Sequence, residues 1–201
     1  MATYKYSSWS FGQVEALLNI LGGDDVAKKV LAGTVKVTVE VLSHIVDGDA
    51  DPFLPDGWEV EKHKKQGEMK ITRASDDLYV NGKKIEFFLS KPQEKGETIV
   101  GNDLRKELNA LPVLNANVLD YLLAHPELIP DEWKKDTNGN TRYIFFWGTI
   151  YGDSDGHLRR VRCLYWLDGR WRWNDFWLDD GWGTDSPAAL LASQSVTYSK
   201  T

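Results

Sequence analysis

The hydrophobic positions near the start of the chain follow a helical period. A capping box at Ser10 and Gln13 precedes a helix that ends before Gly22, and one face of it carries Phe11, Val14, Leu17, Leu18 and Leu21. A second, shorter helix runs from Asp24 to Gly33. A DNA-binding helix-turn-helix is the alternative, but the second helix offers only Lys28 and Lys29 and no side chain that reads bases. The pattern favours a packed hairpin of two amphipathic helices.

From Thr34 the hydrophobic period changes to two, which predicts strands. The first is expected over 35–41, and others over 58–60, 69–72, 78–80 and 85–89. Asn81 and Gly82 join the last two as a two-residue hairpin turn. The polar, turn-rich segment 91–101 is the candidate boundary between an N-terminal lobe, 1–100, and a C-terminal lobe, 101–201. One continuous domain is the alternative.

Helices resume after this boundary. Asn102 or Asp103 caps one that carries Leu104 and Leu108, and Asn115 or Asn117 caps one that ends before Pro126. A third, very short helix begins at Pro130, and a terminal helix is expected over 187–192, capped by Asp185 or Ser186. These helices and the strands around them predict an α+β fold.

Six of the nine tryptophans lie in a segment, 147–182, that reads as part of a three-stranded antiparallel meander. A turn at Asp168 and Gly169 fixes the cross-strand pairs Trp166 with Trp171, Leu164 with Trp173, Arg162 with Asp175, and Arg160 with Trp177. Extending this register across the loop 153–156 places Trp147 beside Arg162 and Phe145 beside Leu164.

One face of the meander is the candidate ligand-binding site. Its residues are Trp147, Arg160, Arg162, Trp166, Trp171, Trp173, Asp175 and Trp177, with Tyr143 and Phe145 beside them. Tryptophan rings with interleaved guanidinium groups stack on nucleobases or sugars. The same residues also make a core in which an Arg162–Asp175 pair balances charge, and this structural interpretation is favoured because a large exposed aromatic patch promotes aggregation. The opposite face is apolar too, with Ile144, Phe146, Ile150, Val161, Cys163, Tyr165 and Phe176, so both faces need cover or a partner.

Two short motifs are candidates for chemistry. Residues 152–156 match the G-x-S-x-G turn of serine hydrolases, but the segment after it reads as a strand where that turn needs a helix, so a hairpin loop is favoured. Asp47, Asp49 and Asp51 have the opening spacing of a calcium loop, in which Pro52 and Trp58 replace the required Gly and Glu. An acidic turn is the simpler interpretation.

Composition and charge narrow the function classes. The net charge of −6 argues against broad nucleic-acid binding, and one cysteine with four scattered histidines predicts no disulfide, metal site or cofactor. The first residues lack a signal peptide, and no later run has the length of a membrane span. We expect a cytoplasmic protein that does not insert into membranes.

The runs "VLNANVLDYLLAHPELIPDEWK" and "FFWGTIYGDSDGHLRRVRCLYWLDGRWRWNDFWLDDGWGTDSPAALLAS" carry a resemblance. With a weaker echo in "LLNILGGDDVAKKVLAG", the chain resembles a group of uncharacterised bacterial proteins, frequent in candidate-phylum bacteria, that share this Trp-rich ending. The resemblance implies a bacterial, cytoplasmic protein and transfers no activity and no catalytic residue.

Two functions follow as hypotheses. The first is a non-catalytic binding protein whose Trp/Arg face takes a protein, oligonucleotide or sugar ligand. The alternative is an enzyme acting on a carbohydrate-like substrate through Asp175, Asp179 and Asp180, although acids adjacent in sequence do not by themselves supply the spaced pair that a glycosidase needs.

Overall fold

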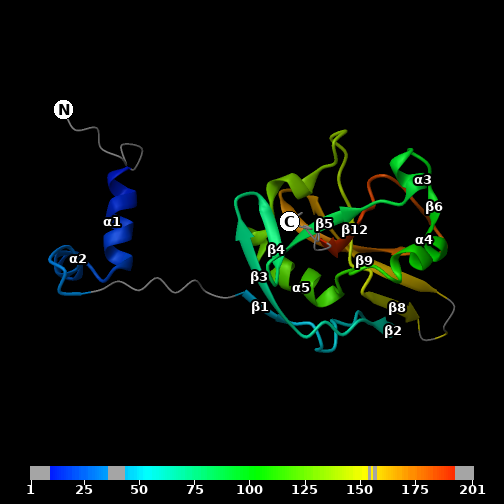
Figure 1. The fold of residues 1–201 in the computed structure, drawn as a ribbon, viewed down its shortest axis with the longest axis horizontal. Coiled ribbons are helices and arrows are strands. Elements are labelled where there is room, and N and C mark those ends of the chain that lie inside the picture. Colours follow the sequence, from blue (N-terminus) through cyan, green and yellow to red (C-terminus); the bar gives the residue numbers. More distant parts are fainter. Residues whose placement is uncertain (1–9, 36–43, 154, 156–157, 193–201) are drawn as a thin grey trace, which may run out of the picture. The chain divides into compact units, whose positions relative to one another are not determined.

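A computed structural model describes residues 10–35, 44–153, 155 and 158–192. The chain divides into two compact units, Met1–Leu42 and Ser43–Thr201 (Figure 1).

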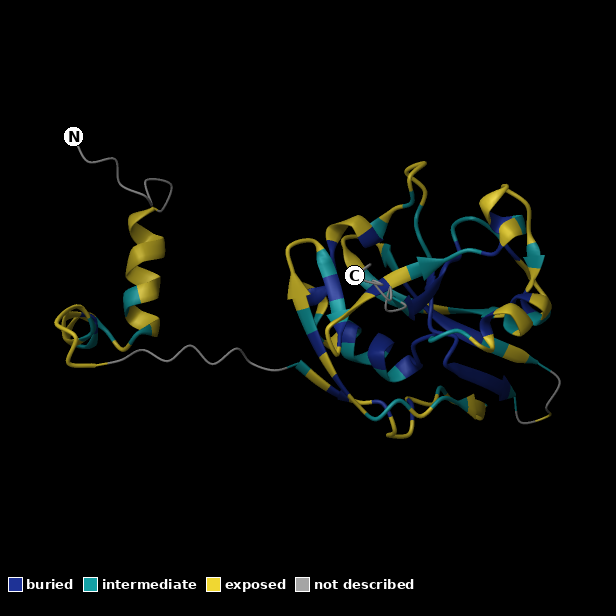
Figure 2. Ribbon diagram, viewed as in Figure 1, coloured by how far each residue is buried: buried dark blue, intermediate teal, exposed yellow. Residues whose placement is uncertain are grey.

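The smaller unit contains a helical hairpin. Helix α1 (Phe11–Ile20) begins at a capping box between Ser10 and Gln13, as predicted, and α2 (Asp24–Leu31) follows directly. Among the described residues of this unit only Ala27 is buried, and the hairpin is coloured mostly as exposed in Figure 2. The strand expected over 35–41 lies, apart from Val35, outside the described residues.

The larger unit is built on one mostly antiparallel sheet. Ten strands of the described chain join it in the order β1-β3-β4-β5-β12-β7-β9-β8-β2, with β10 paired to β9. Their bounds are β1 His44–Asp47, β2 Trp58–His63, β3 Glu68–Ala74, β4 Asp77–Val80, β5 Lys83–Phe88, β7 Ile144–Phe145, β8 Thr149–Asp153, β9 Arg159–Leu167, β10 Arg170–Trp177 and β12 Ala188–Leu191. A small second sheet pairs β6 (Ile99–Val100) with β11 (Gly181–Trp182). The predicted division at residue 100 falls inside this unit, where β5 pairs with β12 and β2 with β8.

Short helices cover the sheet. They are α3 (Lys91–Glu94), α4 (Gly101–Leu108), α5 (Ala116–Ala124) and the 3-10 turns η1 (Pro126–Leu128) and η2 (Asp131–Lys134). The fold class is therefore α+β, as the sequence predicts. The Asn81–Gly82 turn is also confirmed, because both residues have positive φ and join β4 to β5.

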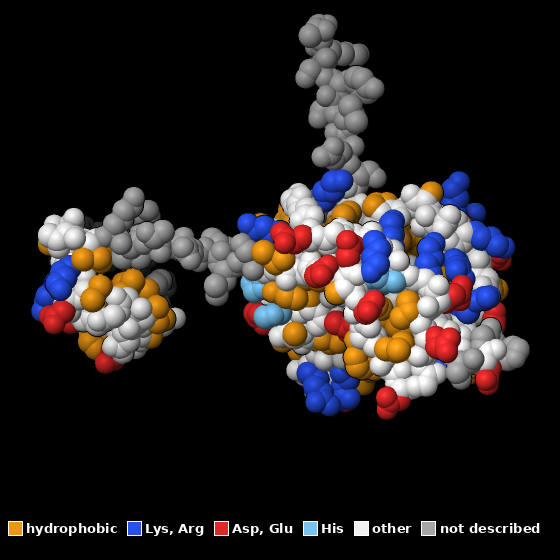
Figure 3. Space-filling model, turned by 90° about the horizontal axis from the view of Figure 1, so that it is seen from below, with side chains coloured by type: hydrophobic (Ala, Val, Ile, Leu, Met, Phe, Trp, Pro, Cys, Tyr) orange, Lys and Arg blue, Asp and Glu red, His pale blue; other side chains and the backbone are white. Residues whose placement is uncertain are grey.

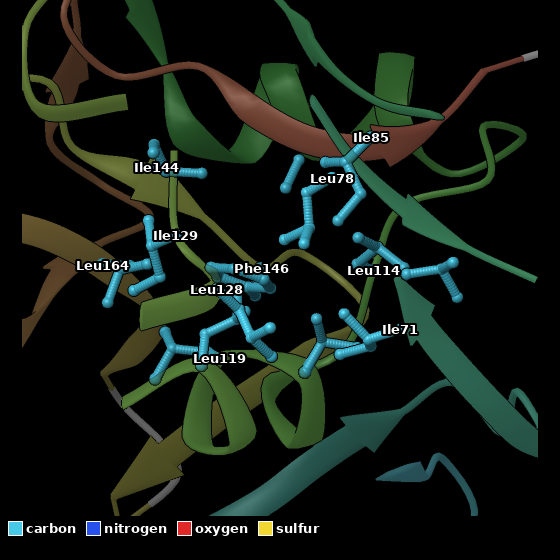
Figure 4. Close-up of a cluster of buried hydrophobic side chains, with 14 of the residues drawn as sticks. Ile71, Leu78, Ile85, Leu114, Leu119, Leu128, Ile129, Ile144, Phe146 and Leu164 are labelled. Carbon is cyan, nitrogen blue, oxygen red and sulfur yellow. The ribbon is translucent and has the colours of Figure 1, made fainter. Parts of the chain in front are cut away.

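Two hydrophobic cores lie on the two faces of the central strands. The first gathers β1, β3, β4 and β5 around α5, η1 and η2 (Figure 4), where Leu119 and Leu128 lie close to Phe146 and Leu164. The second packs α4 against the other face, with Leu108 and Trp182 beside Phe145 and Cys163. Both apolar faces are thus covered, which accounts for strands whose hydrophobic residues do not alternate with polar ones.

The predicted terminal helix is wrong. Residues 188–191 form β12, which inserts between β5 and β7 and is largely buried. A short apolar run has no period that distinguishes a buried strand from a helix. Backbone groups on both sides decide it here, since Leu114 N donates to Ala189 O and Ala192 N donates to Lys84 O.

The predicted register is right on one side of β9 and wrong on the other. All four pairs set by the Asp168–Gly169 turn occur between β9 and β10. On the other side, Phe145 of β7 pairs with Cys163 and Tyr151 of β8 pairs with Arg160. An advance of six residues from β7 to β8 therefore corresponds to only three residues of β9. The extra residues between β7 and β8 change the register, and a one-residue shift moves a side chain to the opposite face. Tyr143, Phe145 and Trp147 consequently join the second core. Ile144 and Phe146, which were predicted on the opposite face, lie instead in the first core with Leu164, on the side of the Trp/Arg face.

Candidate functional site

The structure brings seven of the eight predicted site residues onto one face of β9 and β10. The exception is Trp147, which is 4% exposed and packs against Trp182 in the second core. The other seven form two groups along the face. Trp166 and Trp171 flank the hairpin turn, and the remaining five lie farther along the strands: Arg160, Arg162, Trp173, Asp175 and Trp177.

Arg162 is the centre of the larger group and is only 1% exposed. The predicted ion pair with Asp175 is wrong. The guanidinium instead donates two hydrogen bonds to Asp120 of α5, at 3.0 and 2.7 Å. Its central carbon lies 4.5 Å from the Trp173 ring centroid and 5.0 Å from that of Phe53. The paired charge and the stacked rings stabilise this buried cation, although its Nε–H has no hydrogen-bond partner among the described residues.

Arg160, not Arg162, forms the ion pair with Asp175. Its guanidinium contacts Asp175 at 3.5 Å and lies 4.6 Å from the Trp58 ring centroid. Burial raises the pKa of Asp175, and the positive charge of Arg160 opposes this shift without reversing it. Asp175 therefore takes up a proton more readily than an ordinary aspartate.

The larger group, centred on Arg160 and Arg162, is called the arginine cluster below. The sequence did not indicate four of its members: Phe53, Trp58, Asp120 and Tyr151. Phe53 lies in the turn-rich loop that precedes β2, and Trp58 is the first residue of β2. Asp120 lies in α5. No turn or period relates these segments to β9. Their contacts with it exist because β2 pairs with β8 and because α5 packs against the sheet.

The tryptophans at the hairpin turn line a hollow of about 510 Å³. Trp166 and Trp171 meet edge to face with ring centroids 5.4 Å apart. The opposite wall is apolar and consists of Leu123, Pro126 and Ile129. Lys134 Nζ lies 4.0 Å above the Trp166 ring and pairs with Asp131 at 2.6 Å. Arg170 also lines the hollow, so two cations and one anion belong to its lining.

A second hollow, of about 540 Å³, lies at the outer edge of β10 and is lined by Asp175, Trp177 and Asp180 among others. It brings together two of the three acids of the enzyme hypothesis. Asp179 does not line it, and its carboxylate accepts a hydrogen bond from Asn102 at 2.7 Å.

The two short motifs have different outcomes. A strand, β9, follows the G-x-S-x-G segment, as expected of a hairpin loop, while Ser154 itself lies outside the described residues. Asp47 and Asp49 accept backbone N–H groups of Asp49 and Gly67 at 2.9 and 2.8 Å, as in an ordinary turn. Across the described parts of the chain, no three His, Cys, Asp or Glu side chains come together as a metal site.

The described helices are also relevant to membrane insertion. No helix among the described residues is both long enough and apolar enough to cross a bilayer.

Compared with known proteins, the chain matches no protein-family model, no curated protein and no solved structure.

Proposed function

We propose that this protein binds a small, ring-bearing ligand without transforming it, in the hollow between Trp166 and Trp171. The observation that carries the proposal is the hollow itself, whose 510 Å³ falls within the usual range of small-molecule sites, about 300 to 1,000 Å³. Its two indoles and apolar far wall supply the largely hydrophobic lining of such sites, and its few polar groups stand at the rim.

The state of the arginine cluster supports placing the ligand at the hairpin turn. Arg162 already has two hydrogen bonds and two stacked rings, and Arg160 has a carboxylate and the Trp58 ring. A ligand that bound at the arginine cluster would have to displace these contacts, which stabilise the fold. The indoles at the turn are half-buried and line an open volume, so a ligand gains contact area without that cost.

The lining also indicates the chemistry of the ligand. A flat ring stacks on an indole face, and we assign the stacking to Trp171 because Lys134 already covers Trp166. Arg170 and Lys134 outnumber Asp131 at the rim, which favours a ring with an anionic substituent. Nucleotides and acidic sugars have this chemistry. We place the protein in the cytoplasm, where a single free cysteine such as Cys163 stays reduced.

The test uses two matched variants, Trp171→Leu and Trp177→Leu. Both remove an indole from β10 and keep an apolar side chain, but only Trp171 lines the hollow. Intrinsic fluorescence is titrated with the four ribonucleoside monophosphates, glucuronate and maltose, and thermal unfolding verifies that each variant is folded. Because a stacked base contributes about 1 to 3 kcal/mol, Trp171→Leu should weaken binding by about 5- to 150-fold, and Trp177→Leu should leave it unchanged.

Two results would contradict the proposal. One is the absence of any fluorescence change at millimolar concentrations of all six compounds. The other is an equal loss in the two variants, which would place the ligand elsewhere on β10.

A second function, carbohydrate hydrolysis, is favoured by one observation: Asp175 and Asp180 line the same hollow beside Trp177. A raised pKa suits Asp175 for the general acid and leaves Asp180 for the base or nucleophile. Under this hypothesis Asp180→Asn abolishes turnover of a glycan and keeps its binding. Unaltered turnover, or no turnover of any glycan by the wild-type protein, excludes it.

A further inference from the structure

A small hollow lies on the other side of the sheet, where β2, α4 and the chain between β7 and β8 meet. Its volume is about 30 Å³, and the floor includes Leu108 and Trp147. The rim carries three cationic side chains, Lys62, Lys64 and Arg105. Figure 3, which views the molecule from the side where β2 lies in Figure 1, shows lysine and arginine side chains gathered over part of this face.

Positive charge at the rim exceeds the negative charge that balances it. Glu61 of β2 accepts hydrogen bonds from both Arg105, at 2.9 Å, and Arg159, at 2.5 Å. One carboxylate thus serves two guanidinium groups and leaves both lysines without an acidic partner among the contacts of the described residues. The chain as a whole has a net charge of −6, so this local excess of positive charge stands out. A bound anion would reduce the repulsion among these cations.

The ammonium groups of Lys62 and Lys64 are each held by one hydrogen bond and keep further N–H donors for a ligand. Lys62 Nζ donates to Asn109 Oδ1 at 3.1 Å, and Lys64 Nζ donates to the Leu111 carbonyl at 2.9 Å. Each ammonium group has three N–H donors, so these single bonds orient the side chains and leave two donors each. Burial lowers the pKa of Lys64, and the positive charge of Lys62 lowers it further. The two ammonium groups therefore repel each other as the structure stands.

Trp147 supplies an independent sign of a missing partner. Its ring is 4% exposed, and its Nε1–H is buried with no hydrogen-bond partner among the described residues. A buried donor without an acceptor costs about 1 to 3 kcal/mol, so such groups are rare in folded proteins. An orphan N–H on a residue that lines a cationic hollow points to an acceptor that belongs there.

We propose that this hollow is an anion site that takes one phosphate group, either of inorganic phosphate or of a phosphorylated small molecule. Three cations match a dianion, and phosphate oxygens accept hydrogen bonds from ammonium, guanidinium and indole N–H donors alike. A volume of 30 Å³ admits anionic oxygens and excludes a ring, so the rest of a larger ligand would lie in the mouth. The site is separate from the Trp166/Trp171 hollow, and each proposal fails or holds without the other.

The first test is calorimetric titration with inorganic phosphate. Lys62→Gln and the double variant Lys62→Gln/Lys64→Gln are compared with the wild type, and Lys83→Gln, an exposed lysine of β5 outside the hollow, is the control. A hydrogen bond to a charged group contributes about 1.5 to 3 kcal/mol, so each lysine lost should weaken binding roughly tenfold or more. Lys62 is exposed, so its replacement leaves the core intact even if the double variant does not fold.

The second test follows the orphan donor. In a ¹H–¹⁵N spectrum the indole N–H resonance of Trp147, assigned with Trp147→Phe, should shift on addition of phosphate, with the same midpoint as the calorimetry. An unmoved resonance, or equal affinity in Lys62→Gln and Lys83→Gln, overturns the proposal. Glucose 6-phosphate and AMP distinguish the source: tighter binding than inorganic phosphate identifies a phosphorylated small molecule, and equal binding identifies phosphate itself.

Discussion

Replacing Arg162 by methionine should lower the free energy of unfolding by about 3 kcal/mol, because it breaks a buried ion pair. Methionine keeps most of the apolar stem between Phe53 and Trp173 and removes the guanidinium. The side chain of Asp120 is 28% exposed, so water hydrates the carboxylate that is left behind. The loss should therefore lie at the lower end of the range for broken buried pairs, about 3 to 5 kcal/mol.

Asp120→Asn should cost more, about 4 to 5 kcal/mol, although it is the smaller chemical change. The charge that it leaves unpaired is that of Arg162, which is 1% exposed and has no access to water. The double variant removes both charges, and a buried pair replaced by neutral groups is often close to neutral in stability. The two single losses add up to about 7 to 8 kcal/mol, so their sum should exceed the loss in the double variant by several kcal/mol.

Urea denaturation followed by circular dichroism measures the four free energies of this cycle. Arg160→Met, Asp175→Asn and their double variant form the matched control, because that pair has one contact of 3.5 Å and each side chain is 18% exposed. Its coupling should not exceed about 1 kcal/mol. The reasoning is refuted if Arg162→Met costs less than about 1 kcal/mol, or if the two cycles give equal coupling.

Three further predictions concern positions outside this cluster. In urea denaturation, Gly148→Ala should lower the free energy of unfolding several times more than Gly152→Ala. A Cβ on Gly148 would lie 2.7 Å from the Asn115 backbone nitrogen, whereas a Cβ on Gly152 has no neighbour nearer than 3.7 Å. Equal losses in the two variants would contradict the close packing at Gly148. Burial lowers the pKa of His63, so on acidification the unfolded chain binds a proton at this residue before the folded protein does. The free energy of unfolding should therefore fall as the pH drops below about 6.5, and it should fall less in His63→Gln. Identical pH profiles of the two proteins would exclude this histidine as the cause. Burial raises the pKa of the Cys163 thiol, so a disulfide reagent should label it only as fast as the protein opens, and immediate labelling under native conditions would count against its burial.

The sequence by itself determined the elements whose causes are local. The capping box at Ser10, the turn at Asn81 and Gly82 and the turn at Asp168 and Gly169 each fix a backbone path within a few residues. Because strand register follows from a tight turn, the last of these also determined every pair between β9 and β10. The Trp166/Trp171 pair at the candidate site was predictable for this reason.

Only the tertiary structure decided on which face of the sheet the remaining site residues lie and which residues they contact. Trp147 changed faces because extra residues between β7 and β8 shift the register, and no turn signal marks that shift. Arg162 pairs with Asp120 because α5 packs against this face, a contact between segments far apart in sequence. The run 188–191 is a strand because β5 and β7 offer hydrogen bonds on both sides of it. Local chemistry sets turns and periods, whereas burial and long-range pairing assign each side chain its neighbours.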